Sequence, residues 1–129
     1  MIDYGFVKEL DKSFEDVCEI LPAELQKEGF GILTKIDVKE KLKEKLGIDF
    51  KKYIIFGACN PPNAHKALTI EENIGLMLPC NVIVYEKEGK TVLAVIRPAV
   101  AMEAVKNEAL LPVAKEVEEK LKRVFDAIS

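Results

Sequence analysis

The sequence predicts an α+β domain in which a mostly antiparallel sheet carries its main helices on one face. Strand-like segments follow one another closely in the second half of the chain, and two of them flank a hairpin turn at residues 87–90. Helical periodicity is concentrated in one segment near the start and one long segment at the end. A chain of 129 residues, of which 49% are hydrophobic, can bury its own core, so we assign residues 1–129 to one domain.

The first part of the chain predicts a strand, a helix and a second strand. The first strand covers residues 2–9, and Ser13 followed by Asp16 is a variant of the capping box that opens a helix. The apolar residues of this helix recur at helical spacing: Phe14, Val17, Cys18, Leu21 and Leu25. Pro22 lacks a backbone N–H, so we expect it to kink or split the helix. The second strand covers residues 30–36.

The next part predicts a short helix and then a central strand. Asp37 indicates the start of the helix and Gly47 its end. We expect three apolar side chains of this helix to face inward: Val38, Leu42 and Leu46. The strand at residues 52–59 carries few polar residues on either face. A sheet with one face in water alternates more cleanly, so the second face is expected to be partly covered, most simply by the partner of a homodimer.

The remaining chain predicts a short helix, a hairpin and a long final helix. Asn60 is placed to cap a helix over residues 62–69, with proline near its first position. Strands at residues 80–87 and 90–97 form the hairpin and bring the sheet to five strands. The helix from Leu111 to Ala127 has one apolar face: Val113, Val117, Leu121, Val124, Phe125 and Ile128. We expect this helix to lie across the sheet.

Composition narrows the function classes. The formal net charge of -3 argues against nucleic acid as a partner, because binding to phosphates needs clustered positive charge. No segment approaches the roughly 20 apolar residues that cross a bilayer, and the first residues do not resemble a secretory signal, so we expect no membrane partner. Three cysteines do not suit a secreted disulfide framework, and we expect the protein in the cytoplasm.

One group of chemically distinctive residues lies at two predicted strand ends. The third strand ends in Cys59-Asn60-Pro61, and the fourth begins with Pro79-Cys80-Asn81. If these strands pair antiparallel with Cys59 opposite Cys80, both thiols share one face, with their Cβ atoms roughly 4.5–5.5 Å apart. The connection between them carries His65, the one histidine of the chain. The sequence contains no GxSxG, Walker or HExxH motif that would compete as the centre of chemistry.

Several interpretations of this group remain open. Cys59, His65 and Cys80 are residue types that hold zinc with one open coordination position. The two cysteines alone are suited to a redox disulfide or an activated thiolate, and equally to packing as small buried hydrophobes. Asn60 and Asn81 either bond to the nearby backbone at the strand ends or converge on the floor of a ligand pocket.

Three stretches of the chain resemble the domain of unknown function 302 family. They are residues 29–38, which begin Gly-Phe-Gly-Ile-Leu-Thr-Lys, residues 56–61 and residues 78–82. His65 and the later Arg97-Pro98 also fit the family pattern. The resemblance implies a curved antiparallel sheet like that of the TATA-binding protein, in the order β-α-β4-α, and a homodimer. It supplies no activity, but the family motifs fall on Cys59, Asn60, His65, Cys80 and Asn81.

We therefore expect a small cytoplasmic domain that binds a small molecule or a metal at a cluster at one end of the sheet. The expected ligand-binding residues are Cys59, Asn60, His65, Cys80 and Asn81, and the expected metal ligands are Cys59, His65 and Cys80. Two alternatives remain, which are a thiol-dependent redox protein using Cys59 and Cys80, and a purely structural homodimer module.

Overall fold

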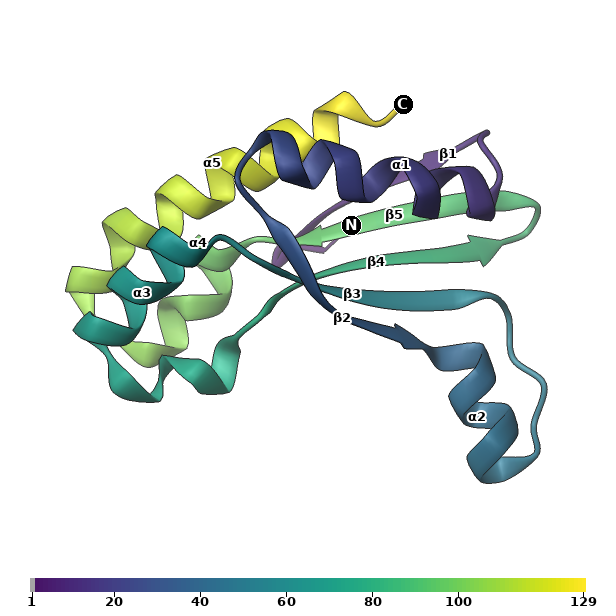
Figure 1. Ribbon diagram of the computed structural model, residues 1–129, viewed down its shortest axis with the longest axis horizontal. Helices are drawn as coiled ribbons and strands as arrows, with labels where there is room; N and C mark the ends of the chain where they lie inside the picture. The colour runs from purple at the N-terminus through teal and green to yellow at the C-terminus, as the bar shows by residue number, and fades with distance from the viewer. Residues whose placement is uncertain (1) are drawn as a thin grey trace.

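Five strands form one open antiparallel sheet in the computed structural model, which describes residues 2–129 (Figure 1). The strands are β1 (Gly5–Leu10), β2 (Gly31–Asp37), β3 (Tyr53–Cys59), β4 (Cys80–Lys87) and β5 (Lys90–Ile96). Their order across the sheet is β1-β5-β4-β3-β2, and every neighbouring pair is antiparallel. The two strands that precede and follow the first helix therefore occupy opposite edges of the sheet.

The helices lie mainly on one side of this sheet. The α-helices are α1 (Phe14–Lys27), α2 (Val38–Leu46), α3 (Pro61–Ile70), α4 (Pro98–Ala101) and α5 (Leu111–Ala127). Three short 3₁₀ helices join them: η1 (Glu72–Met77), η2 (Met102–Val105) and η3 (Glu108–Leu110). Figure 1 shows α1 and α5 side by side over the sheet, with α3 and α4 gathered at one end. The α+β class and the order of strand, helix, four strands and helix are thus confirmed.

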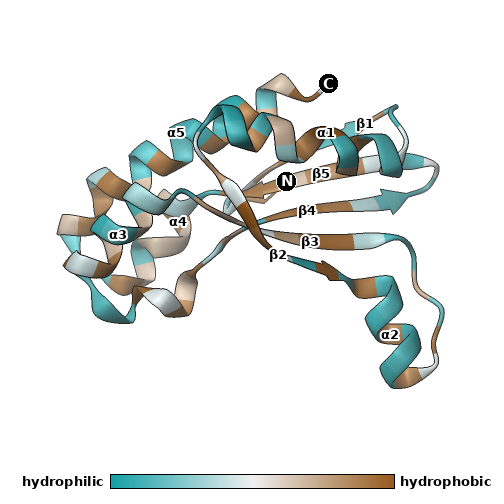
Figure 2. Cartoon of the chain, viewed as in Figure 1, coloured by the Kyte–Doolittle hydropathy of each residue, from teal (hydrophilic) through white to brown (hydrophobic). Residues whose placement is uncertain are grey.

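The core lies between the sheet and the two long helices. Alternate residues of β3, β4 and β5 face α1 and α5 and are almost completely buried, among them Phe56, Val84 and Leu93. Leu21 of α1 and Leu121 of α5 meet them from the helical side. Figure 2 shows long hydrophobic stretches in β3, β4 and β5. We call this side of the sheet the covered face and the other side the open face.

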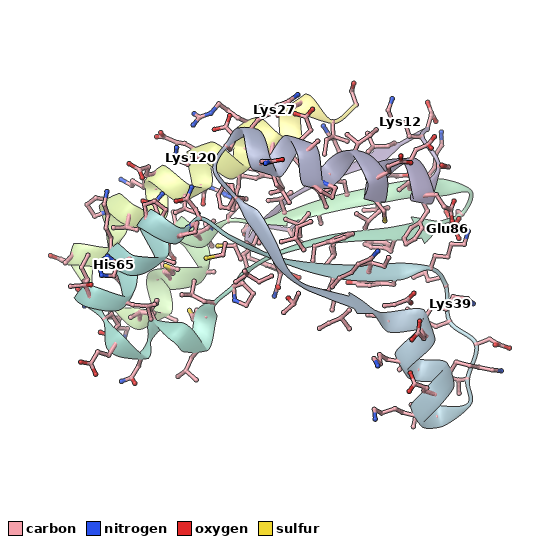
Figure 3. All side chains as sticks on the ribbon, viewed as in Figure 1. Lys12, Lys27, Lys39, His65, Glu86 and Lys120 are labelled. Carbon is pink, nitrogen blue, oxygen red and sulfur yellow. The ribbon has the colours of Figure 1, made fainter. Side chains whose placement is uncertain are left out.

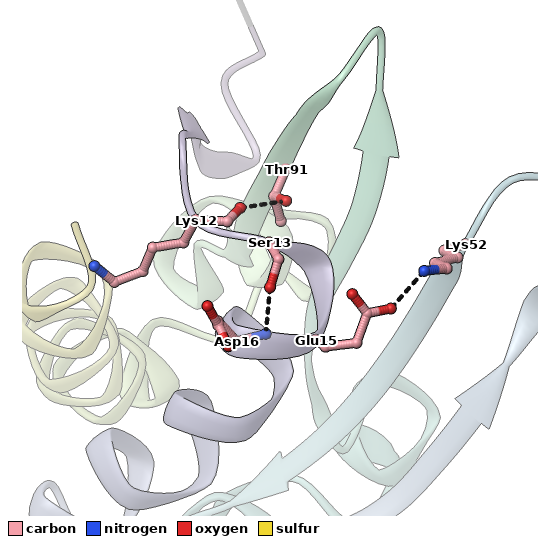
Figure 4. A network of polar contacts seen from close by, with 6 residues as sticks. All are labelled: Lys12, Ser13, Glu15, Asp16, Lys52 and Thr91. Atoms are coloured by element: carbon pink, nitrogen blue, oxygen red, sulfur yellow. Dashed lines mark hydrogen bonds and ion pairs between the residues drawn. The ribbon is translucent and has the colours of Figure 1, made fainter.

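Helix α1 begins where the sequence predicted. Ser13 Oγ accepts a hydrogen bond from the Asp16 backbone N–H at 3.1 Å, which satisfies one of the free donors of the first turn. The same corner is tied to the sheet, because Thr91 Oγ1 donates to the Lys12 carbonyl oxygen at 2.7 Å (Figure 4). Lys52 and Glu15 add an exposed ion pair. The helix runs through Pro22 as one element, so the predicted split does not occur.

Helix α2 departs from its predicted environment. Asp37 caps it and Gly47 ends it in the left-handed conformation, both as expected. The helix nevertheless projects from one end of the sheet (Figure 1), and none of its residues is buried. Leu46, predicted to face inward, is 67% exposed. Helix α2 does have apolar residues at helical spacing. It lies beyond the end of the sheet, however, where few residues of the described chain are available to pack against it.

The segment between β5 and α5 has more structure than the sequence suggested. One turn of α-helix and two 3₁₀ turns, α4, η2 and η3, occupy residues 98–110. Leu110 joins Ala67 and Ile74 in a second, smaller buried cluster beneath α3. This cluster supports α3 against α5 at the end of the sheet. Among the described residues, no helix is both long enough and apolar enough to span a bilayer.

Candidate functional site

A cavity opens where β3 ends and β4 begins, between α3 and α5. Its volume is about 310 Å³, at the small end of the range for ligand sites. We call it the α3 cavity. It is lined by Phe30, Leu33, Ala58, Cys59, Asn60, Asn63, Ala64, Ala67, Leu68, Leu78, Pro79, Cys80, Pro98, Met102, Val113, Ala114 and Val117. Within residues 2–129, this lining contains no charged side chain.

Asn60 fixes the corner between β3 and α3. Its Oδ1 accepts from the Asn63 backbone N–H at 3.3 Å and so caps the helix, while the two prolines that follow need no such partner. Its Nδ2 donates to the Glu28 carbonyl oxygen at 3.2 Å, which ties the cap to the end of α1. The backbone-bonding interpretation of Asn60 is therefore confirmed, although the residue also lines the cavity.

Asn63 is the polar residue of the cavity that the sequence did not single out. It is only 4% exposed, and its Nδ2 donates to Asn60 Oδ1 at 3.1 Å. The available sequence signal is a second Asn in the first turn of the short helix, close to the capping Asn60, and such a residue needs a defined set of hydrogen bonds once it is buried. Its burial, however, depends on α5 and the second cluster, which periodicity alone does not position.

The predicted pairing of Cys59 with Cys80 is wrong by one residue. Cys80 lies opposite Ala58, and the ladder continues with Phe56 opposite Val82. The reason is burial, since this register places Ala58, Phe56 and Val82 together on the covered face, all at 2% exposure or less. Cys59 follows Ala58 at the end of the strand. Both thiols still line the α3 cavity, so the predicted neighbourhood holds while the direct opposition does not.

The Cys80 thiol is kept protonated by its surroundings. Burial, with a smaller contribution from the neighbouring Cys59, raises the pKa of Cys80 from 9.0 to about 11. All three cysteines are free thiols in this structure. Since the thiolate is the nucleophilic and metal-binding form, the environment of Cys80 favours packing over reactivity at neutral pH.

His65 and Asn81 do not line the α3 cavity. His65 is exposed on α3 (Figure 3) and is not among the residues that line the cavity. No group of three or more His, Cys, Asp or Glu residues in the described chain is placed to hold a metal ion, so Cys59, His65 and Cys80 are not assembled as a metal site. Asn81 lies opposite Gly57 on the open face, where it lines a different groove.

That second groove runs along the open face and has a volume of about 580 Å³. It is lined by Ile2, Tyr4, Gly5, Val7, Phe50, Lys51, Tyr53, Asn81, Ile83, Tyr85, Lys87, Ala94, Val95 and Ile96. The rings of Tyr53 and Tyr85, which both line it, stack with their centroids 5.1 Å apart. Lys51 Nζ lies 4.9 Å from the centre of the Tyr85 ring. We call this groove the open-face groove.

An irregularity in β2 positions a further residue at the cavity. Ile32 pairs with Ala58 and Thr34 with Gly57, so Leu33 is the extra residue of a β-bulge. Leu33 lines the α3 cavity although 66% of it is exposed, which places it at the rim. No residue pattern indicates this bulge, because Leu33 fits the alternation of a regular strand equally well.

Comparisons with known proteins agree with this fold. The family described as "Domain of unknown function DUF302" matches residues 6–128. A crystal structure of an uncharacterized conserved DUF302 protein from Bacillus stearothermophilus is similar, with a TM-score of 0.92 and 29% sequence identity. The alignment covers 99% of this chain and 100% of that one. No curated protein matches the chain.

Proposed function

The chain belongs to the DUF302 family, and from its α3 cavity we propose that it binds a small, uncharged, mostly apolar molecule. The observation that carries this proposal is the cavity itself, a hollow of about 310 Å³ lined almost wholly by apolar groups. A packed core seldom leaves such a space, because interiors are filled as densely as organic crystals. An apolar hollow at the meeting point of several elements is the usual form of a small-molecule site.

The rim of the cavity supports the same proposal. Leu33 of β2 and Leu68 of α3 both line the cavity and are exposed. Exposed apolar side chains at an opening give an apolar ligand a path from water into the interior at little desolvation cost. A charged ligand lacks support, because no lysine, arginine, aspartate or glutamate within residues 2–129 faces it in the lining.

The interpretations based on thiol and metal chemistry have less support. A redox or nucleophilic role for Cys59 and Cys80 needs an accessible thiolate, whereas burial raises the pKa of the Cys80 thiol to about 11. A metal bound by Cys59, His65 and Cys80 needs the imidazole near the two sulfurs, and His65 is exposed outside the cavity lining. Three free thiols are compatible with a reducing cytoplasm, which remains the compartment we propose.

The proposal is tested by filling the cavity. Ala64→Phe introduces a ring at a half-buried lining position, and Ala23→Phe introduces the same ring on the exposed side of α1 as a matched control. The neutral fluorophore N-phenyl-1-naphthylamine, which brightens in apolar surroundings, reports occupancy. We expect the Ala64→Phe variant to lose the signal and the Ala23→Phe variant to keep it. Equal brightening in all three proteins would place the probe elsewhere and reject the cavity as the binding site.

The open face supports a separate proposal, that two copies of the chain associate through it as a homodimer. Its groove combines exposed Tyr4 and Val7 with a stacked pair of tyrosines. Exposed apolar patches of this kind mark interfaces. A second copy fits because an isologous contact repeats one patch on both subunits. Sedimentation velocity tests this proposal directly.

A further inference from the structure

The α3 cavity contains one side-chain amide oxygen that accepts no hydrogen bond from residues 2–129. Apart from the two thiols, Asn60 and Asn63 are the polar side chains among its described lining residues. Asn60 uses both ends of its amide, since Oδ1 accepts from Asn63 and Nδ2 donates to the Glu28 carbonyl oxygen. Asn60 is therefore a structural part of the cavity wall.

Asn63 differs because only one end of its amide is engaged. Its Nδ2 donates to Asn60 Oδ1 at 3.1 Å, which fixes the orientation of the amide plane. Of the hydrogen bonds found within residues 2–129, none uses Asn63 Oδ1 as the acceptor. No buried side-chain oxygen or nitrogen of these residues lacks a partner, so Oδ1 is not sealed from solvent. Because Asn63 is 96% buried and lines the cavity, the surface it retains faces the cavity.

A ligand that fills this cavity shields Asn63 Oδ1 from solvent. A purely hydrocarbon ligand would leave the oxygen without a donor in an apolar enclosure, and an unpaired buried acceptor is costly. A ligand with an N–H or O–H group restores the lost bond. Such a donor also orients the ligand, since a few fixed polar groups in an apolar pocket determine how a molecule binds.

We infer that the ligand of the α3 cavity is an uncharged apolar molecule with one hydrogen-bond donor, which it gives to Asn63 Oδ1. This inference rests on the proposed function and adds the chemical class of the ligand. The class includes neutral alcohols, phenols and N–H heterocycles of small size. It excludes carboxylates and phosphates for two reasons. Their charged oxygens accept hydrogen bonds and so cannot donate to Asn63 Oδ1, and the lining offers no cationic side chain among residues 2–129.

The test compares two ring systems of nearly equal shape. Indole carries an N–H group where indene carries a CH₂ group, and their affinities are measured by calorimetry on the wild-type protein, on Asn63→Leu and on Asn107→Leu. Asn107 is a half-buried asparagine that caps η3 and does not line the α3 cavity, so it is the matched control. We expect Asn63→Leu to lower the ratio of indole to indene affinity by about 3–10-fold, the value of one neutral hydrogen bond. Asn107→Leu should leave the ratio unchanged.

The outcomes separate this inference from the proposed function. If both probes bind and the ratio is the same in Asn63→Leu and wild-type protein, the donor requirement is rejected while the apolar cavity stands as a binding site. If neither probe binds the wild-type protein, the inference is rejected, and the fluorophore experiment with Ala64→Phe and Ala23→Phe decides the proposed function. Should Asn63→Leu fail to fold, the wild-type protein alone still decides the matter. The N–H proton of bound ¹⁵N-indole must then move downfield and be protected from solvent exchange, and an unshifted, freely exchanging proton overturns the inference.

Discussion

Gly57 is the most tightly surrounded of the three glycines in the strands, which are Gly5, Gly31 and Gly57. A Cβ atom at this residue would lie 2.2 Å from Thr34 Oγ1 and 2.6 Å from the Pro79 Cγ. The threonine hydroxyl can rotate away, but the proline ring is held by the chain on both sides. We predict that Gly57→Ala lowers the free energy of unfolding by about 1–3 kcal/mol, as overpacking does. Urea denaturation measures this loss.

The control for this prediction is another glycine of the same sheet. A Cβ atom at Gly31 meets nothing within 4 Å, so Gly31→Ala should change the free energy of unfolding by no more than about 0.5 kcal/mol. Equal losses in the two variants would mean that backbone flexibility, and not the contact with Pro79, explains the effect at Gly57.

Cys80 couples the stability of the fold to alkaline pH. Its pKa is raised from 9.0 to about 11 in the folded protein, so the unfolded chain loses this proton first as the pH rises. The protonated Cys80 thiol therefore makes its full contribution to the free energy of unfolding below pH 9, and this contribution is lost as the pH rises from 9 through about 11. We predict that wild-type protein loses about 2–3 kcal/mol more than Cys80→Ala over this interval. Urea unfolding at pH 7, 9, 10 and 11 checks this, and parallel curves for the two proteins would contradict it.

At the level of single residues, the sequence predicted local chemistry well and long-range register poorly. The caps by Ser13, Asp37 and Asn60 depend on side chains a few positions from their partners, and all three are present. The pairing of Cys80 depends on which neighbours of Ala58 are buried, which is determined by α1 and α5. A shift of one residue costs nothing in local propensity, so the sequence could not exclude it.

Among the elements, β2 affects the cavity more than its length suggests. Its bulge places Leu33 at the rim of the α3 cavity, while the regular strand that follows places Ile36 outside the cavity lining. Bulges commonly redirect a side chain next to a binding site. Leu33 therefore borders the entrance without belonging to the buried core of the described chain.

We predict that Leu33→Ala weakens binding without weakening the fold. With 66% of the side chain exposed, its removal should change the free energy of unfolding by less than about 0.5 kcal/mol. Loss of its apolar contact with the ligand should reduce indole affinity by about 2–5-fold, equivalent to part of one buried side chain. Ile36→Ala is the control, since Ile36 is exposed on the same strand and lies outside the cavity lining. Equal affinity in both variants would remove Leu33 from the site.

The two helices α5 and α2 mark the limits of prediction for elements. The predicted bounds of α5, Leu111 to Ala127, are those observed, because a long apolar stripe has one way to face a sheet. Helix α2 has apolar spacing too, but with nine residues and an exposed position its stripe has little to pack against. Periodicity predicts that a helix exists, whereas its burial depends on where the chain leads it. The α3 cavity depends on where α3 and α5 lie relative to the sheet. For this reason the sequence predicted only the cavity residues at the strand ends, Cys59, Asn60 and Cys80.

For the molecule as a whole, the two faces of the sheet differ in what covers them. The covered face forms the core and, at one end, opens into the α3 cavity. The open face carries Ile55, Ile83 and the stacked Tyr53 and Tyr85, which α1 and α5 do not cover. The sequence anticipated this second apolar face from the few polar residues of β3. Ligand binding and self-association are thus proposed for separate surfaces and can be tested independently.

Val7 provides the test of self-association, because it lines the open-face groove and is 43% exposed. In a homodimer built on this face, Val7→Lys would bring an ammonium group into an apolar contact, where loss of hydration opposes association. We predict that wild-type protein sediments as a dimer and that Val7→Lys raises the dissociation constant by at least about tenfold. Leu76→Lys is the control, since Leu76 is 90% exposed on η1 and lies outside this groove.

Two outcomes would contradict this prediction. The homodimer is rejected if the wild-type protein is monomeric at 100 μM, a concentration chosen to exceed the ~1 μM dissociation constants of modest dimers. A dimer sensitive only to Leu76→Lys would move the interface to the α3 end of the molecule, and the entrance of the cavity would then lie beside the partner subunit.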